Sequence, residues 1–523
     1  MSARFATEGP YFVPHYHPDK GGRDFLGMGQ VNLDMMSNCL PGINNVTWYI
    51  RAFSVVSWIY WKFHMLAEQK GAGTVTAEEL RIWKEKVETL FTWGHKRNGG
   101  RVPGRDSYPP TSGVVPLDFA AWKRSAENTS LMAAVQYGPA SKTIDGLGFL
   151  EPLGRGFFQT VGHGVELAEA LDSELSRFDL LRKLGPAKAS ADQADGLYRA
   201  WSVFEPTNAE RKIFRSAFFD PTTIGQSTPM GRRSTTLQLA IEALKSARKT
   251  VPAERVRILM FRGNRRSKRL GVVDARLRPA WLRWMVLQTR QSQRLAMEGL
   301  LAWFERLLAR GNRDTDTIVQ ETVKAIKDYE HVFPLFKPER VIKTLQRQIP
   351  TFDQLLSSAG SKSDVDLFNL MENITRTTSP SEESDEVAPY CLRTLFLCGV
   401  VTQLLQDEPI ARAETQRGTS SDRLSLSFWT DRLFRWKDFE MGDFLRQVFE
   451  TLILSQHFSV AARRFDGQTQ RLRISIEDNG LELLADKPLV PTVTNDRLYT
   501  ALSLMEDCGL IGWNESDEGY FAN

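Results

Sequence analysis

The stretch Gly146–Leu171, GLGFLEPLGRGFFQTVGHGVELAEAL, holds six glycines in its first nineteen residues and then becomes regularly helical. Glycines at this density serve phosphate-binding loops, tight turns or helix ends. Two short runs with large apolar residues flank Gly154-Arg155-Gly156, a pattern that predicts a β-hairpin with the glycines in its turn. Thr160 would then cap a helix that begins near Val165.

A phosphate-binding loop does not fit the same residues. The Walker loop needs GxxxxGK[ST], in which lysine neutralises phosphates and the hydroxyl holds magnesium, and no such string occurs in the chain. A dinucleotide fingerprint needs a third glycine after Gly146 and Gly148, at the position that Glu151 occupies. We therefore interpret the glycines as turn and cap residues.

This region resembles the winged helix-turn-helix family, because it contains in order a helix, the run GLGFLEP, the glycine turn and the run QTVGHGVELAEAL. The end of the chain has a similar arrangement: a helix capped by Asn495 or Asp496, then Leu510–Trp513 pairing with Tyr520–Phe521 across the turn NESDEG. The resemblance implies that the first wing presents Arg155 to a nucleic acid. Because the second wing is acidic, it would repel phosphates, and we expect it to contact a protein.

Helical patterns dominate the rest of the sequence. Ala52–Leu66, AFSVVSWIYWKFHML, is too short to span a bilayer and carries Lys62 and His64, so it predicts a buried helix. Thr76 with Glu79 forms a capping-box pattern, and Pro279–Leu308 carries a broad apolar stripe with a bend near Gln291. The predicted fold is mainly α with small β-hairpins: helical bundles plus one or two winged helix-turn-helix modules.

Composition shifts along the chain suggest five parts. These are residues 1–125, an N-terminal helical domain; 126–178, a winged-helix-like module; 179–356, a basic helical domain; 357–389, a linker or mobile loop; and 390–523, an acidic C-terminal domain ending in a winged-helix-like module. The linker is predicted from its Ser, Thr, Pro and acidic residues.

Charge is unevenly distributed although the net charge is only +4. Residues 231–310 contain 19 Lys and Arg against 5 Asp and Glu, a difference of +14. Residues 361–523 contain 16 Lys and Arg against 27 Asp and Glu, a difference of −11. The asymmetry predicts a middle region that binds a polyanion. An alternative is that the basic middle docks on the acidic end, within one chain or between copies.

The densest basic segment is FRGNRRSKRLG at Phe261–Gly271. Each cation that neutralises a phosphate releases counterions, so such a segment can bind nucleic acid without sequence specificity. The predicted nucleic-acid-binding residues are Arg155, Arg232, Arg233, Lys245, Arg248, Lys249, Arg262, Arg265, Arg266, Lys268 and Arg269. The sequence does not decide whether these residues bind DNA or RNA or bind neither. The alternative interpretation is that the segment is a solvated surface loop without a binding role.

Catalytic and metal-binding motifs are not evident. The chain has no GxSxG or HExxH string, and its four cysteines lack CxxC spacing. His15, His17 and Asp19 have no downstream partner at ligand spacing, so we predict neither a metal nor a cofactor. Unpaired cysteines suit a reducing compartment, and no signal peptide is evident, so we expect a cytoplasmic protein that does not associate with membranes.

The stretch CLPGINNVTWYIRAFSVVSWIYWKF resembles uncharacterised bacterial proteins of antiphage defence islands, through Pro41, Gly42, Arg51, Phe53 and Trp58. The resemblance implies a context and no mechanism. We therefore expect a non-catalytic nucleic-acid-binding or scaffolding subunit of a defence complex, with DNA on the basic middle and a partner such as an ATPase or nuclease on the acidic end. The alternatives are a metal-dependent nuclease with a dispersed site and a pure protein-interaction subunit.

Overall fold

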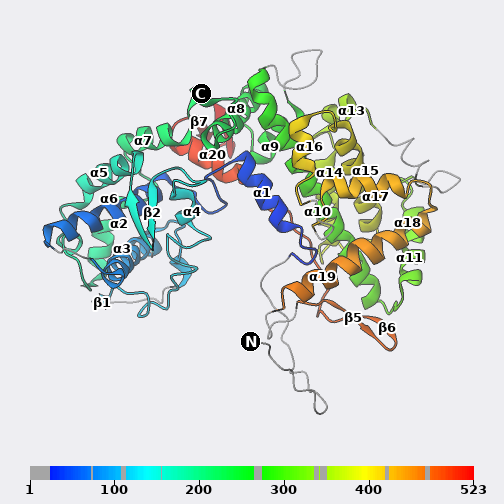
Figure 1. The fold of residues 1–523 in the computed structure, drawn as a ribbon, viewed down its shortest axis with the longest axis horizontal. Coiled ribbons are helices and arrows are strands. Elements are labelled where there is room, and N and C mark those ends of the chain that lie inside the picture. The colour runs from blue at the N-terminus through cyan, green and yellow to red at the C-terminus, as the bar shows by residue number, and fades with distance from the viewer. Residues whose placement is uncertain are drawn as a thin grey trace, which may run out of the picture. The chain divides into compact units, whose positions relative to one another are not determined.

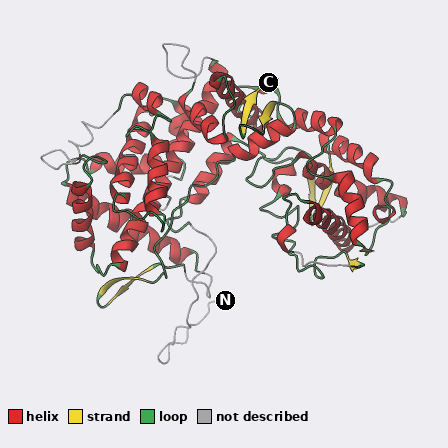
Figure 2. Ribbon diagram, turned by 180° about the vertical axis from the view of Figure 1, so that it is seen from behind, coloured by secondary structure: helices red, strands yellow, loops and turns green. Residues whose placement is uncertain are grey.

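The structure is a computed structural model and describes residues 24–71, 75–107, 113–154, 156–263, 274–334, 341, 350–418, 423–465 and 471–523. Helices make up most of this part of the chain, and its strands pair in two-stranded antiparallel sheets (Figure 1, Figure 2). The predicted mainly α fold with small β-hairpins is confirmed at this level.

The chain divides into two compact units that do not follow the order of the sequence. Unit 1 comprises Met1–Asn32 and Gln288–Val493, and unit 2 comprises Leu33–Leu287 and Thr494–Asn523. Two of the boundaries fall inside helices, α1 (Gly29–Cys39) and α10 (Arg278–Ala309).

Unit 2 consists of helices with short strands between them. Its helices are α2 (Ile50–Gln69), α3 (Ala77–Asn98), α4 (Tyr137–Ser141), α5 (His163–Leu175), α6 (Ala191–Trp201), α7 (Asn208–Phe218), α8 (Pro229–Ala247), α9 (Ala253–Arg262) and α20 (Leu498–Asp507). Its strands are β1 (Val115–Pro116), β2 (Leu150–Gly154), β3 (Phe157–Thr160), β4 (Lys188–Ala189), β7 (Ile511–Asn514) and β8 (Gly519–Ala522). The strands pair as β1–β4, β2–β3 and β7–β8.

Helix α2 is a core helix of unit 2, as its apolar sequence predicts. Every residue from Ile50 to Tyr60 is buried, because α3, α5 and the β2–β3 hairpin pack around it. The next helix begins with the predicted capping box, in which Thr76 accepts a hydrogen bond from the Glu79 backbone and the Glu79 carboxylate accepts one in return. Local signals therefore fix both the burial of α2 and the start of α3.

The glycine-rich stretch forms the predicted hairpin. Leu150 of β2 pairs with Thr160 of β3, and Gly154 and Gly156 have φ of +93° and +82°, which glycine adopts without strain. A side chain at Gly164 would place its Cβ 2.4 Å from the Phe149 carbonyl oxygen. The last glycine of the stretch therefore permits a close approach between backbones, so turn geometry and packing together require these glycines.

Thr160 does not cap the following helix, contrary to the sequence prediction. Helix α5 begins at His163, and its N-cap is Gly162 without a side-chain hydrogen bond. Thr160 instead ends β3, and its hydroxyl donates to the Ser57 carbonyl of α2 at 3.1 Å. The hydroxyl thus ties the hairpin to the core helix and is not available as a cap.

The C-terminal elements pack against helices from the middle of the chain (Figure 1). Helix α20 contacts α9, and β8 contacts α8. Val251, between α8 and α9, forms an antiparallel bridge with Tyr520 of β8, with N–O distances of 3.0 and 2.9 Å. The predicted C-terminal hairpin is confirmed, with Trp513 opposite Tyr520. One small sheet therefore joins segments that are far apart in sequence.

Unit 1 is a helical bundle with one hairpin. Its elements are α11 (Thr315–Asp328), α13 (Phe352–Ser358), α14 (Leu367–Thr378), α15 (Val387–Leu404), α16 (Pro409–Thr415), α17 (Leu426–Arg435), α18 (Met441–Gln447), the π-helix η5 (Val448–Leu454), α19 (Ser455–Arg463), β5 (Ile474–Glu477) and β6 (Gly480–Leu483). Within the described part of the chain, α15 alone is long and apolar enough to cross a membrane, and 83% of it is buried in the structure, as in a core helix.

The structure differs from the sequence prediction at residues 357–389. Where the composition predicts a linker, α14 runs from Leu367 to Thr378 and buries Leu370 and Ile374. Its exposed residues are Glu372, Thr375 and Arg376, and the serines of the segment lie outside the helix, so the composition of the whole segment hides the helical spacing of its apolar residues.

The long helix predicted at Pro279–Leu308 is α10, which runs from Arg278 to Ala309. Its middle, residues 288–294, is polar yet fully buried. Arg290 donates to the Met28 carbonyl, to the Asn32 side chain and to carbonyls at Arg423 and Leu424. The interruption of the apolar stripe therefore reflects a buried polar network that holds the segment beginning at Asp24.

Candidate nucleic-acid interface

The predicted basic site divides into described and undescribed parts. Arg155, Arg265, Arg266, Lys268 and Arg269 lie outside the described residues. The remaining predicted residues, Arg232, Arg233, Lys245, Arg248, Lys249 and Arg262, lie on α8, on α9 or in the turn between these helices.

Arg233 is a structural residue, which corrects its sequence assignment. It is 2% exposed, and its guanidinium donates to the carbonyls of Ala217, Phe218 and Pro41 at 2.8, 2.8 and 3.0 Å. Two of these carbonyls end α7, where a cation complements the helix dipole. Burial lowers the pKa of Arg233 to about 10, so it stays charged at neutral pH. A phosphate cannot reach it.

Two further predicted cations already have partners inside the protein. Lys245 forms an ion pair with Glu242, one turn earlier on α8, at 3.1 Å. The half-buried Arg232 donates to the Ser227 carbonyl at 2.9 Å. Both partners compete with a phosphate for these side chains.

Arg248 and Lys249 are exposed at the end of α8, and neither forms an ion pair with another described residue. Arg248 ends the helix in the left-handed conformation, with φ of +55°. The half-buried Arg255 and Arg262 lie seven residues apart on α9, which places them on one face of the helix. Arg248, Lys249 and Arg262 are members of the predicted site, and Arg255 is a further cation on α9 that the prediction did not include.

Other arginines of the basic middle pair with acids of the C-terminal part, as in the intrachain docking alternative. In unit 2, Arg257 contacts Asp496 at 2.6 Å. In unit 1, Arg306 contacts Glu383 at 2.9 Å and Arg310 contacts Asp385 at 2.8 Å. Part of the charge asymmetry is therefore neutralised within the chain and does not report a surface for polyanions.

Several titratable groups that could act in catalysis are buried. His95 contacts the Phe91 carbonyl with one ring nitrogen and accepts from the Val203 N–H with the other, and burial lowers its pKa to about 4. Burial also raises the pKa of the Cys391 and Cys398 thiols well above the usual range. Among the described residues, no group of three His, Cys, Asp or Glu side chains is placed to hold a metal ion. They offer no ligand set on which a nuclease could be proposed.

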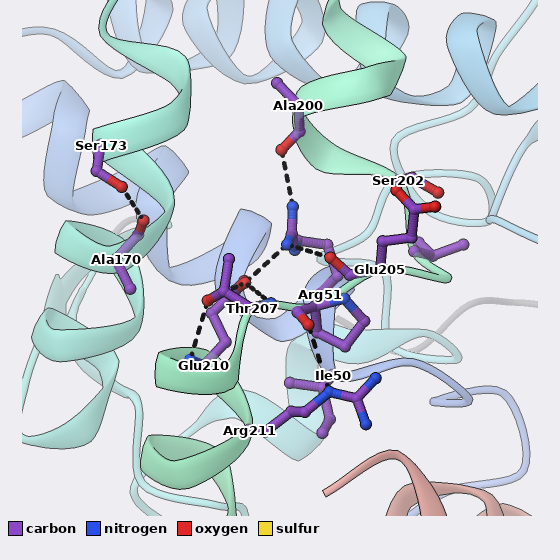
Figure 3. A network of polar contacts seen from close by, with 12 residues as sticks. Ile50, Arg51, Ala170, Ser173, Ala200, Ser202, Glu205, Thr207, Glu210 and Arg211 are labelled. Atoms are coloured by element: carbon purple, nitrogen blue, oxygen red, sulfur yellow. Dashed lines mark hydrogen bonds and ion pairs between the residues drawn. The ribbon is translucent and has the colours of Figure 1, made fainter.

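Arg51 lies at the centre of a buried polar network in unit 2 (Figure 3). Its guanidinium donates to the Ala200 carbonyl at 2.7 Å and the Glu205 carbonyl at 2.6 Å, and it pairs with the Glu210 carboxylate at 2.8 Å. The same carboxylate closes the capping box that begins α7 at Thr207. The arginine thereby joins α2, α6 and the start of α7.

The other residues of the stretch that resembles defence-island proteins also have packing roles. Gly42 has φ of +76°, and a Cβ there would lie 2.9 Å from the Gly146 carbonyl carbon. Phe53 and Trp58 are fully buried, and the Trp58 indole donates to Asp172 at 2.9 Å.

A cleft of about 510 Å³ lies beside the β7–β8 hairpin, and sequence reasoning missed it. We call it the β7–β8 cleft; its lining residues are Pro252, Ala253, Glu254, Tyr499, Trp513, Glu515, Glu518 and Tyr520. The acidic turn was visible in the sequence, but Glu254 lies on α9, which long-range contacts such as the pairing of Val251 with Tyr520 bring beside the hairpin.

The chain matches no protein-family model, no curated protein and no solved structure.

Proposed function

We propose that α8, Val251, α9, α20, β7 and β8 form a winged helix-turn-helix module that the insertion 263–497 divides in sequence. That module type has the order helix, short strand, helix, helix and two-stranded wing, and here α8, α9, α20 and β7–β8 supply the helices and the wing. The single bridge residue Val251 stands at the strand position, and its pairing with Tyr520 supports the proposal because it joins that position to the wing.

Helix α20 occupies the position of a recognition helix, but its outward face is already in contact with protein. The Tyr499 ring packs edge-on against Trp48 at 5.1 Å, and the Ser503 hydroxyl donates to the Trp48 carbonyl. The Ile50 N–H donates to Asp507 at 3.1 Å. A helix covered in this way does not enter a DNA groove, so nucleic acid would meet α8 and α9 instead.

The proposed function is a non-catalytic, cytoplasmic nucleic-acid-binding scaffold, of the kind found as a subunit of an antiphage defence complex. The observation that carries it is the exposed or half-exposed set Arg248, Lys249 and Arg255, which form no ion pair within the described part of the chain and precede the basic run after Arg262. The acidic end would bind a partner protein, as its charge predicts.

Charge reversal on this surface tests the proposal. In Lys249→Glu with Arg255→Glu, we expect weaker binding to a short fluorescein-labelled DNA duplex, because two phosphate-neutralising cations are lost. The slope of log affinity against log salt should fall in magnitude by about two. Fluorescence anisotropy between about 50 and 200 mM salt measures this slope. Reversal of Arg265, Arg266, Lys268 and Arg269 to Glu extends the test to the adjacent run.

The matched control is Lys212→Glu with Arg215→Glu, which makes the same charge change on exposed residues of α7 in the same unit. It should leave the salt slope unchanged. Equal weakening by both variants, or no DNA binding by the unmodified protein, contradicts the proposal. Cleavage of plasmid DNA in Mg²⁺ by extensively purified protein contradicts the non-catalytic role.

A further inference from the structure

The β7–β8 cleft is lined by three aromatic side chains, two of which are partly exposed to solvent. Tyr499 and Trp513 are 39% and 38% exposed, whereas Tyr520 is 5% exposed. The Trp513 and Tyr520 rings lie edge to face with centroids 4.7 Å apart. Exposed aromatic residues around a cleft are typical of a surface that packs against a ligand or partner.

The rim of the same cleft is acidic and unneutralised. Glu254, Glu515 and Glu518 are exposed, and none forms an ion pair with another described residue. The segment 511–523 contains three carboxylates and no lysine or arginine. By contrast, Asp496 near the start of α20 is buried against Arg257. Carboxylates beside partly exposed aromatic rings attract a cation and repel a phosphate.

The cleft is held in shape by backbone pairing. A Cβ at Gly519 would lie 2.8 Å from the Thr250 side chain and 2.9 Å from the Val251 carbonyl, so β8 approaches the α8–α9 turn closely. The Asn514 side chain donates to Asp517 and accepts from the Ser516 N–H, both at 3.0 Å. The rim carboxylates of the turn are therefore presented on an ordered hairpin, which lowers the entropy cost of binding.

We propose that the β7–β8 cleft binds the guanidinium of an arginine in a basic segment of a partner protein. This inference rests on the proposed scaffold function, because it names the class of partner for the acidic end. The planar guanidinium stacks on Trp513 and Tyr499, and its N–H groups donate to the carboxylates of Glu515, Glu518 or Glu254. Arginine suits the site better than lysine, because its flat, weakly hydrated head combines stacking with forked hydrogen bonds.

Peptide binding tests the proposal on the full chain. The probe is fluorescein-labelled (Gly-Ser-Arg)3, compared with (Gly-Ser-Lys)3 and (Gly-Ser-Gln)3 by fluorescence polarisation. We expect the arginine peptide to bind most tightly and the glutamine peptide not to bind. Glu515→Gln with Glu518→Gln should weaken arginine-peptide binding by roughly tenfold, as should Trp513→Leu, whereas Trp513→Phe keeps an aromatic face and most of the affinity.

The matched control is Glu477→Gln with Asp478→Asn, which removes two exposed carboxylates from the β5–β6 hairpin of unit 1. It should leave peptide binding unchanged. Equal weakening by this control, or equal binding of all three peptides, overturns the cleft assignment. DNA anisotropy with the same proteins keeps the two proposals apart: if Lys249→Glu with Arg255→Glu does not change DNA binding, the nucleic-acid role fails while the peptide result stands.

Discussion

Arg51 and Glu210 illustrate how a single buried pair organises the helices of unit 2. Their side chains are 3% and 0% exposed, so neither charge is solvated by water. The arginine satisfies carbonyls of α6 and of the loop after it, and the glutamate satisfies the first turn of α7. A pair of this kind matters chiefly because removing one partner leaves the other charged and unpaired in the interior.

We predict that Arg51→Met destabilises unit 2 by about 3–5 kcal/mol, because the Glu210 carboxylate loses its compensating charge. Urea unfolding followed by tryptophan fluorescence measures the change. Arg97→Met is the control, since Arg97 pairs with Asp195 while 40% exposed, and such a surface pair is worth about 1 kcal/mol or less. Arg51→Met with Glu210→Gln should recover part of the loss. A loss for Arg51→Met no larger than that of the control contradicts the prediction.

For single residues, the sequence shows which positions are basic but not whether each side chain is exposed or buried. The pattern of charges along residues 231–310 is the same whether an arginine faces solvent or a carbonyl, and Arg233 and Arg248 differ only in where α8 presents them. Arg248 is exposed, and Arg233 faces the end of α7. Predicting a basic segment was therefore possible, whereas predicting its members required the packing of α7 and α8.

Among the elements, hairpins and capped helices were predictable because their signals are local. The turn of β2–β3 contains Gly154 and Gly156, and α3 begins with a complete capping box. Helix α14 was missed because the segment 357–389 around it has the composition of a linker, although Leu367, Leu370, Met371 and Ile374 follow helical spacing. Local sequence patterns could not predict the β7–β8 cleft, because one of its lining residues, Glu254, comes from a segment far from the hairpin in sequence.

Helix α20 ends with a carboxyl group in an unfavourable place, which predicts a pH effect. Burial raises the pKa of Asp507 from 3.8 to about 6. The hydrogen bond that its carboxylate accepts from the Ile50 N–H lowers the pKa, but this effect is smaller than that of burial. Because the folded pKa lies above the unfolded one, this group's contribution to stability is fully present below about pH 4 and is lost as the pH rises through about 6.

Asp507→Asn should remove this dependence. The unfolding free energy of the variant minus that of the unmodified protein should rise by up to about 3 kcal/mol between pH 4 and pH 7. Urea unfolding at a series of pH values measures this difference, in which the effects of other groups cancel. Asp517→Asn, on the exposed turn of the same C-terminal segment, is the control and should give a flat difference. A flat difference for Asp507→Asn as well contradicts the assigned pKa.

For the whole molecule, the division of the chain was the least predictable feature. The sequence suggests five consecutive parts, whereas each compact unit combines two separate segments. Residues 229–262 and 498–522 belong to one structure, and the segment between them forms most of the other unit. Patterns read in windows of ten to twenty residues carry no information on such long-range pairing, which depends on contacts such as that of Val251 with Tyr520.

Because the C-terminal segment completes unit 2, its removal should loosen that unit and spare unit 1. A chain ending at residue 494 loses the buried apolar residues of α20 and the partner of Val251, so α8 and α9 become exposed on one side. Hydrogen exchange should then show lost protection in Pro229–Arg262 and unchanged protection in α15 of unit 1. A synthetic peptide of residues 495–523 should restore protection, and a scrambled peptide of the same composition should not. Equal loss in α15, or no loss in α8 and α9, contradicts the assignment of the C-terminal segment to unit 2.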